Sequence, residues 1–112
     1  MASPVQQIIE PQQLLDAASQ LYVSTDVWTQ IQALNCANTD TGTRVITIYI
    51  VPFGTSPATS NITTPPLSIL AGGNYNGRNE YGMVMNPGDS LWAFADVGAK
   101  VNIFASGLLL TG

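Results

Sequence analysis

The residues that could do chemistry in this chain are few. The 112-residue sequence has no histidine and a single cysteine, Cys36. Nucleophilic catalysis usually pairs its nucleophile with a histidine base, and a structural zinc site needs several Cys or His ligands. No cationic residue adjoins Cys36 in the sequence, so we expect its thiol to be a small buried hydrophobe. These observations predict a protein that is not an enzyme and that binds no metal and no cofactor.

Carboxylates are the remaining candidates for acid–base chemistry or calcium binding. Asp89 and Asp96 could form a pair, as could Asp16 and Asp26. Asp89, however, ends an Asn-Pro-Gly-Asp turn, where its side chain is expected to cap backbone amides. The polar run 38–42 could hold calcium, but its composition is more typical of a turn. We therefore expect structural roles for these acids.

Charge is scarce in the whole chain. Three cations, Arg44, Arg78 and Lys100, face seven acids, for a net charge of −4. Charged residues make up 9% of the chain, against about 25% in ordinary soluble domains. The surface is therefore either polar and neutral on a free monomer or partly buried against other protein chains, and we favour the second. A basic patch for nucleic acid or anionic lipid is lacking.

No run of apolar residues is long enough to span a membrane. The first residues lack a basic segment followed by an apolar run, so a secretory signal is not expected and synthesis in the cytosol is the default. Binding to a membrane or to nucleic acid is therefore not predicted.

The stretch 44–52 is the clearest strand in the sequence. Ile46, Ile48 and Ile50 alternate onto one apolar face, because side chains point to opposite sides along a strand. The other face, which includes Tyr49, is mostly apolar too. A strand with two apolar faces predicts a sandwich whose outside is covered by something else.

The rest of the chain reads as seven or eight short strands separated by Gly, Pro and Asn turns, with no helical pattern of useful length. This predicts an all-β fold, an antiparallel β-sandwich of jelly-roll-like type. A bulged strand over 27–37 is expected to form a hairpin with 44–51, and 52–66 is expected to be a long loop. Residues 1–13 are predicted to be an extended N-terminal arm, and 14–112 the sandwich domain.

Aromatic side chains are predicted on the outer surface of the sandwich. Trp92 alternates with the predicted core residues of 90–96, Phe104 with those of 100–106, and Tyr49 with the isoleucines. The sheet could be covered on both faces, the register could be shifted by one residue, or the rings could stack on sugars. A patch for subunit contact is the hypothesis we pursue, with Tyr49, Trp92 and Phe104 as its residues.

Four stretches carry a resemblance to a known class of proteins. They are QALNCANT (32–39), RVITIYIVPFGTS (44–56), MNPGDSLWAFAD (85–96) and VNIFASG (101–107). Together they resemble small β-sandwich virion proteins of tailed bacteriophages, of the decoration or cement, head-fibre and tail-tip kind. The resemblance covers about residues 14–107. It implies a jelly-roll-like subunit that oligomerises as a dimer or trimer and sits on a capsid or tail.

The function expected from these observations is mechanical. A capsid decoration protein would bridge major capsid subunits at the surface of the virion, after synthesis in the bacterial cytoplasm. Candidate capsid contacts are Val5, Ile8 and Ile9 of the arm and Phe53 of the long loop. The alternative is a receptor-binding module of a phage tail or head fibre that recognises bacterial surface glycan through exposed aromatic rings.

Overall fold

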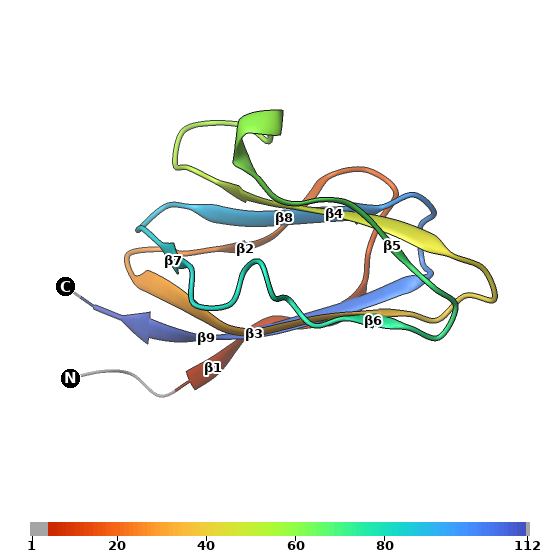
Figure 1. The fold of residues 1–112 in the computed structure, drawn as a ribbon. Coiled ribbons are helices and arrows are strands. Elements are labelled where there is room, and N and C mark those ends of the chain that lie inside the picture. Colours follow the sequence, from red (N-terminus) through yellow and green to blue (C-terminus); the bar gives the residue numbers. More distant parts are fainter. Residues whose placement is uncertain (1–4, 112) are drawn as a thin grey trace.

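The computed structural model describes residues 5–111, which form two antiparallel sheets packed face to face (Figure 1). The strands are β1 (Val5–Gln13), β2 (Ser19–Val23), β3 (Trp28–Asn38), β4 (Arg44–Val51), β5 (Ile62–Ile69), β6 (Asn74–Tyr75), β7 (Val84–Met85), β8 (Ser90–Ala95) and β9 (Val101–Leu110). One short 3-10 turn, η1 (Thr59–Asn61), precedes β5. The prediction of an all-β, two-sheet antiparallel fold is confirmed.

Successive strands alternate between the two sheets for most of the chain. Sheet A has the order β1-β9-β3-β6, with β7 also paired to β3, and sheet B has the order β2-β8-β4-β5. The longest ladder joins β3 to β9, from Trp28 opposite Leu110 to Asn38 opposite Val101. The strand β3 therefore runs from one end of the sandwich to the other.

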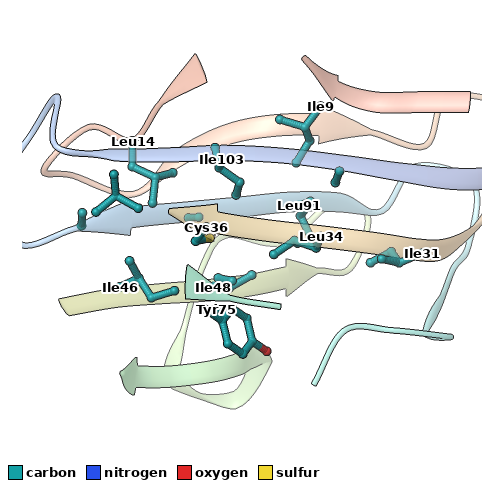
Figure 2. Packing of buried hydrophobic residues seen from close by; sticks show 14 of the residues in the cluster. Ile9, Leu14, Ile31, Leu34, Cys36, Ile46, Ile48, Tyr75, Leu91 and Ile103 are labelled. Carbon is teal, nitrogen blue, oxygen red and sulfur yellow. The ribbon is translucent and has the colours of Figure 1, made fainter. Parts of the chain in front are cut away.

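The core lies between the sheets and is made by the alternating residues that the sequence pattern predicts. Ile46 and Ile48 of β4 are fully buried, and Ile50 packs against the same cluster. They face Leu34 and Cys36 of β3 across the interior (Figure 2). The inward residues of β8 and β9 are those predicted: Leu91, Ala93, Ala95, Val101, Ile103 and Ala105.

The N-terminal segment corrects the arm prediction. Val5–Gln13 is the edge strand β1, which pairs with β9 through two register shifts, and Ile9 is buried in the core. Its lack of a regular period misled the sequence interpretation, because bulges interrupt the alternation of side chains. Residues 1–4 of the predicted arm lie outside the described part of the chain.

The predicted hairpin between 27–37 and 44–51 is wrong, because β3 and β4 belong to different sheets. Each strand buries one apolar face, and the two faces meet across the core instead of pairing edge to edge. The predicted turn itself exists: Asn38 Oδ1 accepts a hydrogen bond from the Asp40 amide at 2.9 Å, and its Nδ2 donates to the Gly42 carbonyl at 2.8 Å. That turn carries the chain from one sheet to the other.

The long loop ends earlier than predicted. Strand β5 begins at Ile62 and includes Pro65 and Pro66. Proline is tolerated there because β5 lies at an edge of sheet B, where its missing N–H breaks no central ladder. The bulge predicted in β3 is present between Ile31 and Ala33. Within the described residues, no helix is long and apolar enough to cross a membrane.

Candidate functional site

A buried carboxylate ties the two sheets together at one side of the sandwich. Glu80 is fully buried, and its Oε2 accepts hydrogen bonds from Thr63 Oγ1 and Thr64 Oγ1, both at 2.6 Å. Its Oε1 accepts one from Tyr75 Oη at 2.7 Å. The threonines lie on β5 of sheet B and the tyrosine on β6 of sheet A. Glu80 therefore closes the side of the sandwich where these two edge strands lie.

The segment that follows Glu80 docks on sheet A. The Ile31 amide donates to the Met83 carbonyl at 3.0 Å, and the Gly82 amide donates to the Ile31 carbonyl at 2.8 Å. Tyr81 and Val84 point outward and are exposed. Glu80 thus anchors a segment that exposes the side chains of Tyr81 and Val84.

Two titratable groups near this carboxylate hold their protons more tightly than usual. Burial, together with the neighbouring Glu80 charge, raises the pKa of Cys36 from 9.0 to about 12. Burial also raises the pKa of Tyr75, with a further contribution from its hydrogen bond to Glu80. The Cys36 thiol is a buried side chain, as the sequence predicts, and lacks the thiolate character that a reactive cysteine needs.

Asp89 and Asp96, one of the two pairs considered for acid–base chemistry, lie far apart. Asp89 and Asp96 flank the six-residue strand β8, so about 20 Å of chain separates them. Asp89 accepts hydrogen bonds from the amides of Phe53 at 3.1 Å and Asn86 at 2.9 Å, which is the predicted capping role. Asp96 accepts one from the Val45 amide at 3.0 Å. No group of three or more metal-ligating side chains occurs within residues 5–111.

The outer face of sheet B carries a closed aromatic cluster. Tyr49 and Trp92 are directly opposite in the β4–β8 ladder, and the Tyr49 and Phe94 rings stack with centroids 6.3 Å apart. Trp92 Nε1 donates to Ser90 Oγ at 2.8 Å. All three rings are half-buried, and Thr47, the ladder partner of Phe94, is buried. The rings cover one another and the sheet beneath them.

The outer face of sheet A is more open. Phe104 of β9 is 42% exposed. Its strand continues outward with Leu108 and Leu110, whose ladder partners are Val5 on β1 and Trp28 on β3. We call the outward residues Val5, Trp28, Val84, Phe104, Leu108 and Leu110 the sheet A patch. Among the residues of the five strands, Glu10 alone is charged.

The structure does not bring the three predicted interface residues together. Tyr49 and Trp92 share the outer face of sheet B, whereas Phe104 lies on the outer face of sheet A. Strands β8 and β9 follow each other in sequence, but the chain crosses between sheets at the turn that joins them. The three rings therefore cannot form one patch.

The four residues predicted to contact the capsid differ in their exposure. Val5 is 57% exposed and Phe53 is 77% exposed, so both are open to a partner. Ile8 is half-buried and packs against the core cluster. Ile9 is only 1% exposed, which corrects its assignment: its side chain is part of the core and is not available for contact.

Phe53 borders a hollow at one end of the sandwich. The hollow has a volume of about 300 Å³ and is lined by Val23, Thr25, Asp26, Phe53, Pro87 and Gly88. The Phe53 ring lies directly on Gly88, where an added Cβ would meet Cδ1 of the ring at 2.7 Å. The Asp89 carboxylate accepts a hydrogen bond from the Phe53 amide. The backbone of this exposed residue is thus tied to the turn before β8, and its ring contacts Gly88.

Sequence reasoning missed Glu80 and the hollow. Glu80 stands in a Gly-rich, polar stretch that is typical of an exposed turn. Its partners Thr63 and Thr64 fall in the stretch 52–66 that the sequence predicts to be a loop, and Tyr75 falls in a turn-rich stretch of Gly and Asn residues. The available signal was a lone acid beside an apolar run, Glu80-Tyr81-Gly82-Met83-Val84, which by itself does not indicate burial.

Comparisons with known proteins give one likeness, and it is in fold. No protein-family model matches it, and no curated protein matches it in sequence. A solved structure from the endospore appendages of Bacillus, described as a novel family of disulfide-linked pili, has a similar fold with a TM-score of 0.55. The two are 16% identical, over 99% of this chain and 90% of the other. At that identity the likeness concerns the fold alone, so the chain is similar in fold to a pilus protein.

Proposed function

We propose that this protein is a non-enzymatic structural subunit that assembles with other protein chains, including copies of itself. The observation that carries the proposal is the sheet A patch, where exposed apolar side chains lie on strands with almost no charge. Apolar surface without charge is what the centre of a protein interface requires. An ordinary interface of about 1,600 Å² gains roughly 25 cal/mol per Å² of apolar burial, which offsets the loss of free motion.

We further propose that the sandwich is a jelly roll. The order β1-β9-β3-β6 in one sheet, with β7 paired to β3, and β2-β8-β4-β5 in the other supports this, because the chain passes back and forth between the two sheets. Such subunits suit assemblies, since the outer face of sheet A and both ends of the sandwich are available for contact. The fold likeness to a protein of disulfide-linked pili supports an assembly role. Disulfide links between copies are not expected for this chain, because its single cysteine is buried.

The experiment that tests the assembly role is size-exclusion chromatography with light scattering at increasing protein concentration. We expect the wild-type mass to exceed that of a monomer. Phe104→Lys places a charge in the sheet A patch and should shift the protein towards monomer. Gln20→Lys is the matched control, because Gln20 is exposed on the edge strand β2 of sheet B. A wild-type protein that remains a monomer at every concentration would contradict the proposal.

The particle that we propose for this subunit is the virion of a tailed bacteriophage, with the major capsid protein as its partner. The motif resemblance described above supports this choice, and the exposed Val5 and Phe53 are the remaining candidate contacts. Removing residues 1–11 would be a poor test, because it deletes Ile9 and most of β1 from the fold. Val5→Lys keeps the fold and should lower the copy number of the protein on purified virions. Unchanged occupancy would exclude Val5 as a contact.

A further inference from the structure

The two ends of the sandwich carry complementary features. At one end lies the hollow, whose lining is apolar except for Thr25 and the carboxylate of Asp26. At the other end lies the β8–β9 turn, which presents Val97 and Lys100, both exposed. Asp26 precedes the start of β3 and Lys100 precedes Val101, which pairs with the last residue of β3. About 33 Å of strand therefore separates them within one molecule. The turn before β3 and the turn between β8 and β9 lie at opposite ends of the ribbon in Figure 1.

Both charges are held on fixed turns. The Lys100 carbonyl accepts hydrogen bonds from the Thr39 amide at 2.9 Å and from Thr39 Oγ1 at 2.7 Å. On the hollow side, Ser24 Oγ donates to the Val27 carbonyl at 2.6 Å. Turns held in this way lose little backbone freedom on binding.

Backbone strain marks the same two turns. Within residues 5–111, positive φ outside glycine occurs at Asp26 and at Ala99, each at 60°. This conformation is costly for residues with a side chain and is kept where the surrounding structure enforces it. One strained residue is the hollow's own acid, and the other adjoins the lysine at the far end.

Neither Asp26 nor Lys100 forms an ion pair within the described part of the molecule. Ion pairs there involve Arg44, with Asp40 at 3.1 Å and Asp96 at 3.6 Å, whereas Asp26 and Lys100 form none. Arg78 is the other exposed cation, but it follows Gly77, which packs against Leu34 in the middle of β3 rather than at an end. Lys100 is therefore the cation placed to meet an acid at the end of another copy.

We propose that the hollow of one copy receives the β8–β9 turn of a second copy, with Lys100 beside Asp26 and the Phe53 ring. The lysine stem would lie on the apolar wall formed by Val23 and Pro87, and the ammonium group would meet both the carboxylate and the ring face. Because the two contact surfaces lie at opposite ends of the sandwich, the contact is head-to-tail and can repeat from copy to copy without closing into a ring. This inference rests on the proposed function and specifies one contact of the assembly.

Charge reversal at each end tests the contact. Analytical ultracentrifugation of the full chain should show mass growing with concentration for the wild type. D26K and K100D should each raise the concentration needed for association by about tenfold or more, since each places like charges together. The controls E10K and R78D make the same changes in net charge elsewhere on the surface and should behave as wild type.

Mixing the two variants gives the decisive result. In an equimolar mixture of D26K and K100D, each turn finds an opposite charge in the hollow of the other variant, so association should return. A failure of the mixture to associate would overturn the proposal, as would wild-type behaviour of K100D alone. Loss of association in D26K but not in K100D would also overturn the lysine contact and would mean that the hollow of one copy receives a different cation of the next copy.

The outcomes also separate this contact from the broader assembly role. Persistent association of D26K and K100D, with loss of association in Phe104→Lys, would overturn the head-to-tail contact and leave the sheet A patch as the interface. A wild type that is always monomeric would overturn both. Binding of neutral glycan that Phe53→Ala abolishes, with no effect of K100D on mass, would assign the hollow to a sugar and overturn the lysine contact.

Discussion

The two sheets of this protein are alike on the inside and different on the outside. Sheet B covers its outer face with its own aromatic rings, where Tyr49 stacks on Phe94 and Thr47 is buried. Sheet A leaves Phe104 and Trp28 exposed on strands with almost no charge. An outward aromatic ring can therefore be in either of two environments. On sheet B it packs against other residues of the same subunit, and on sheet A it is exposed and available to a partner. The pattern of alternation is the same in both.

The sheets also differ in how their edges are held. At the side where β5 and β6 lie, the buried Glu80 accepts hydrogen bonds from both sheets, and the segment after it lies on sheet A. Sheet A further contains Cys36 and Tyr75, the two residues whose pKa values are raised by burial. A change at Glu80 should therefore disturb both sheets at this side, whereas the two groups that are sensitive to alkali lie on sheet A.

The largest effect is expected for Glu80→Ala. The change leaves three buried or half-buried hydroxyl groups without their acceptor, which should lower the free energy of unfolding by about 3 kcal/mol. Urea unfolding followed by tryptophan fluorescence measures it. Glu10→Ala, an exposed acid on β1, is the control and should change stability by less than about 0.5 kcal/mol. Equal stabilities of the two variants would remove Glu80 as the link between the sheets.

The second effect is a loss of stability in alkali. The thiol of Cys36 ionises near pH 9 in the unfolded chain and near pH 12 in the folded protein, so the unfolded state loses its proton first. The contribution of the thiol to the free energy of unfolding is fully present below pH 9. The free energy of unfolding should fall by roughly 2 kcal/mol between pH 9 and pH 11. The raised pKa of Tyr75 acts in the same direction. Urea unfolding at a series of pH values measures the slope.

Cys36→Ala separates the contribution of the thiol from that of Tyr75. The variant should be less stable at pH 8, because it leaves a small cavity in the core, but its stability should fall less steeply above pH 9. A slope identical to that of the wild type would show that Cys36 does not keep its proton through folding.

A smaller effect distinguishes the two outer faces directly. Tyr49→Ala removes a stacked, half-buried ring and should lower the free energy of unfolding by about 1.5 kcal/mol. Phe104→Ala should cost about 0.5 kcal/mol, because the residue is already 42% exposed and its ring stacks on no other ring of the described residues. For self-association the order should reverse, with Phe104→Ala the more damaging change. Thermal unfolding and light scattering on the same samples measure both, and the same order in both assays would break the distinction between the faces.

No effect is expected from reducing agent. The single cysteine is buried on β3, so copies of this chain cannot be joined by disulfides while folded. Light scattering with and without dithiothreitol should give the same mass. A loss of mass on reduction would show that Cys36 becomes exposed in the assembly.

Much of the fold was predictable because strand alternation is a local property. The inward residues of β4, β8 and β9 were identified correctly, as was the bulge in β3. The edge strand β1 was missed because its two register shifts hide the alternation. The hairpin between β3 and β4 was wrongly predicted, because a turn of four or five residues can join strands within a sheet or across a sandwich with similar sequences.

The candidate sites were less predictable than the fold. Phe53 and Val5 were chosen correctly as exposed residues, whereas Ile9 was assigned to the surface and lies in the core. Tyr49, Trp92 and Phe104 were grouped because they share one alternation pattern, although the pattern does not say to which sheet a strand belongs. Roles in subunit or capsid contact stay predictions for the exposed members of both groups.

The sequence by itself determined the class of this protein: strands with apolar inner faces, too few charges for an ordinary free surface, and no residues for histidine-based catalysis. These properties are read along the chain, where the side-chain period and the composition are local. The tertiary structure alone decided which strands share a sheet, and therefore that Phe104 lies across the sandwich from Trp92. It also placed Glu80 among three hydroxyls and set Asp26 and Lys100 at opposite ends, because contacts between distant segments depend on pairing that no local pattern records.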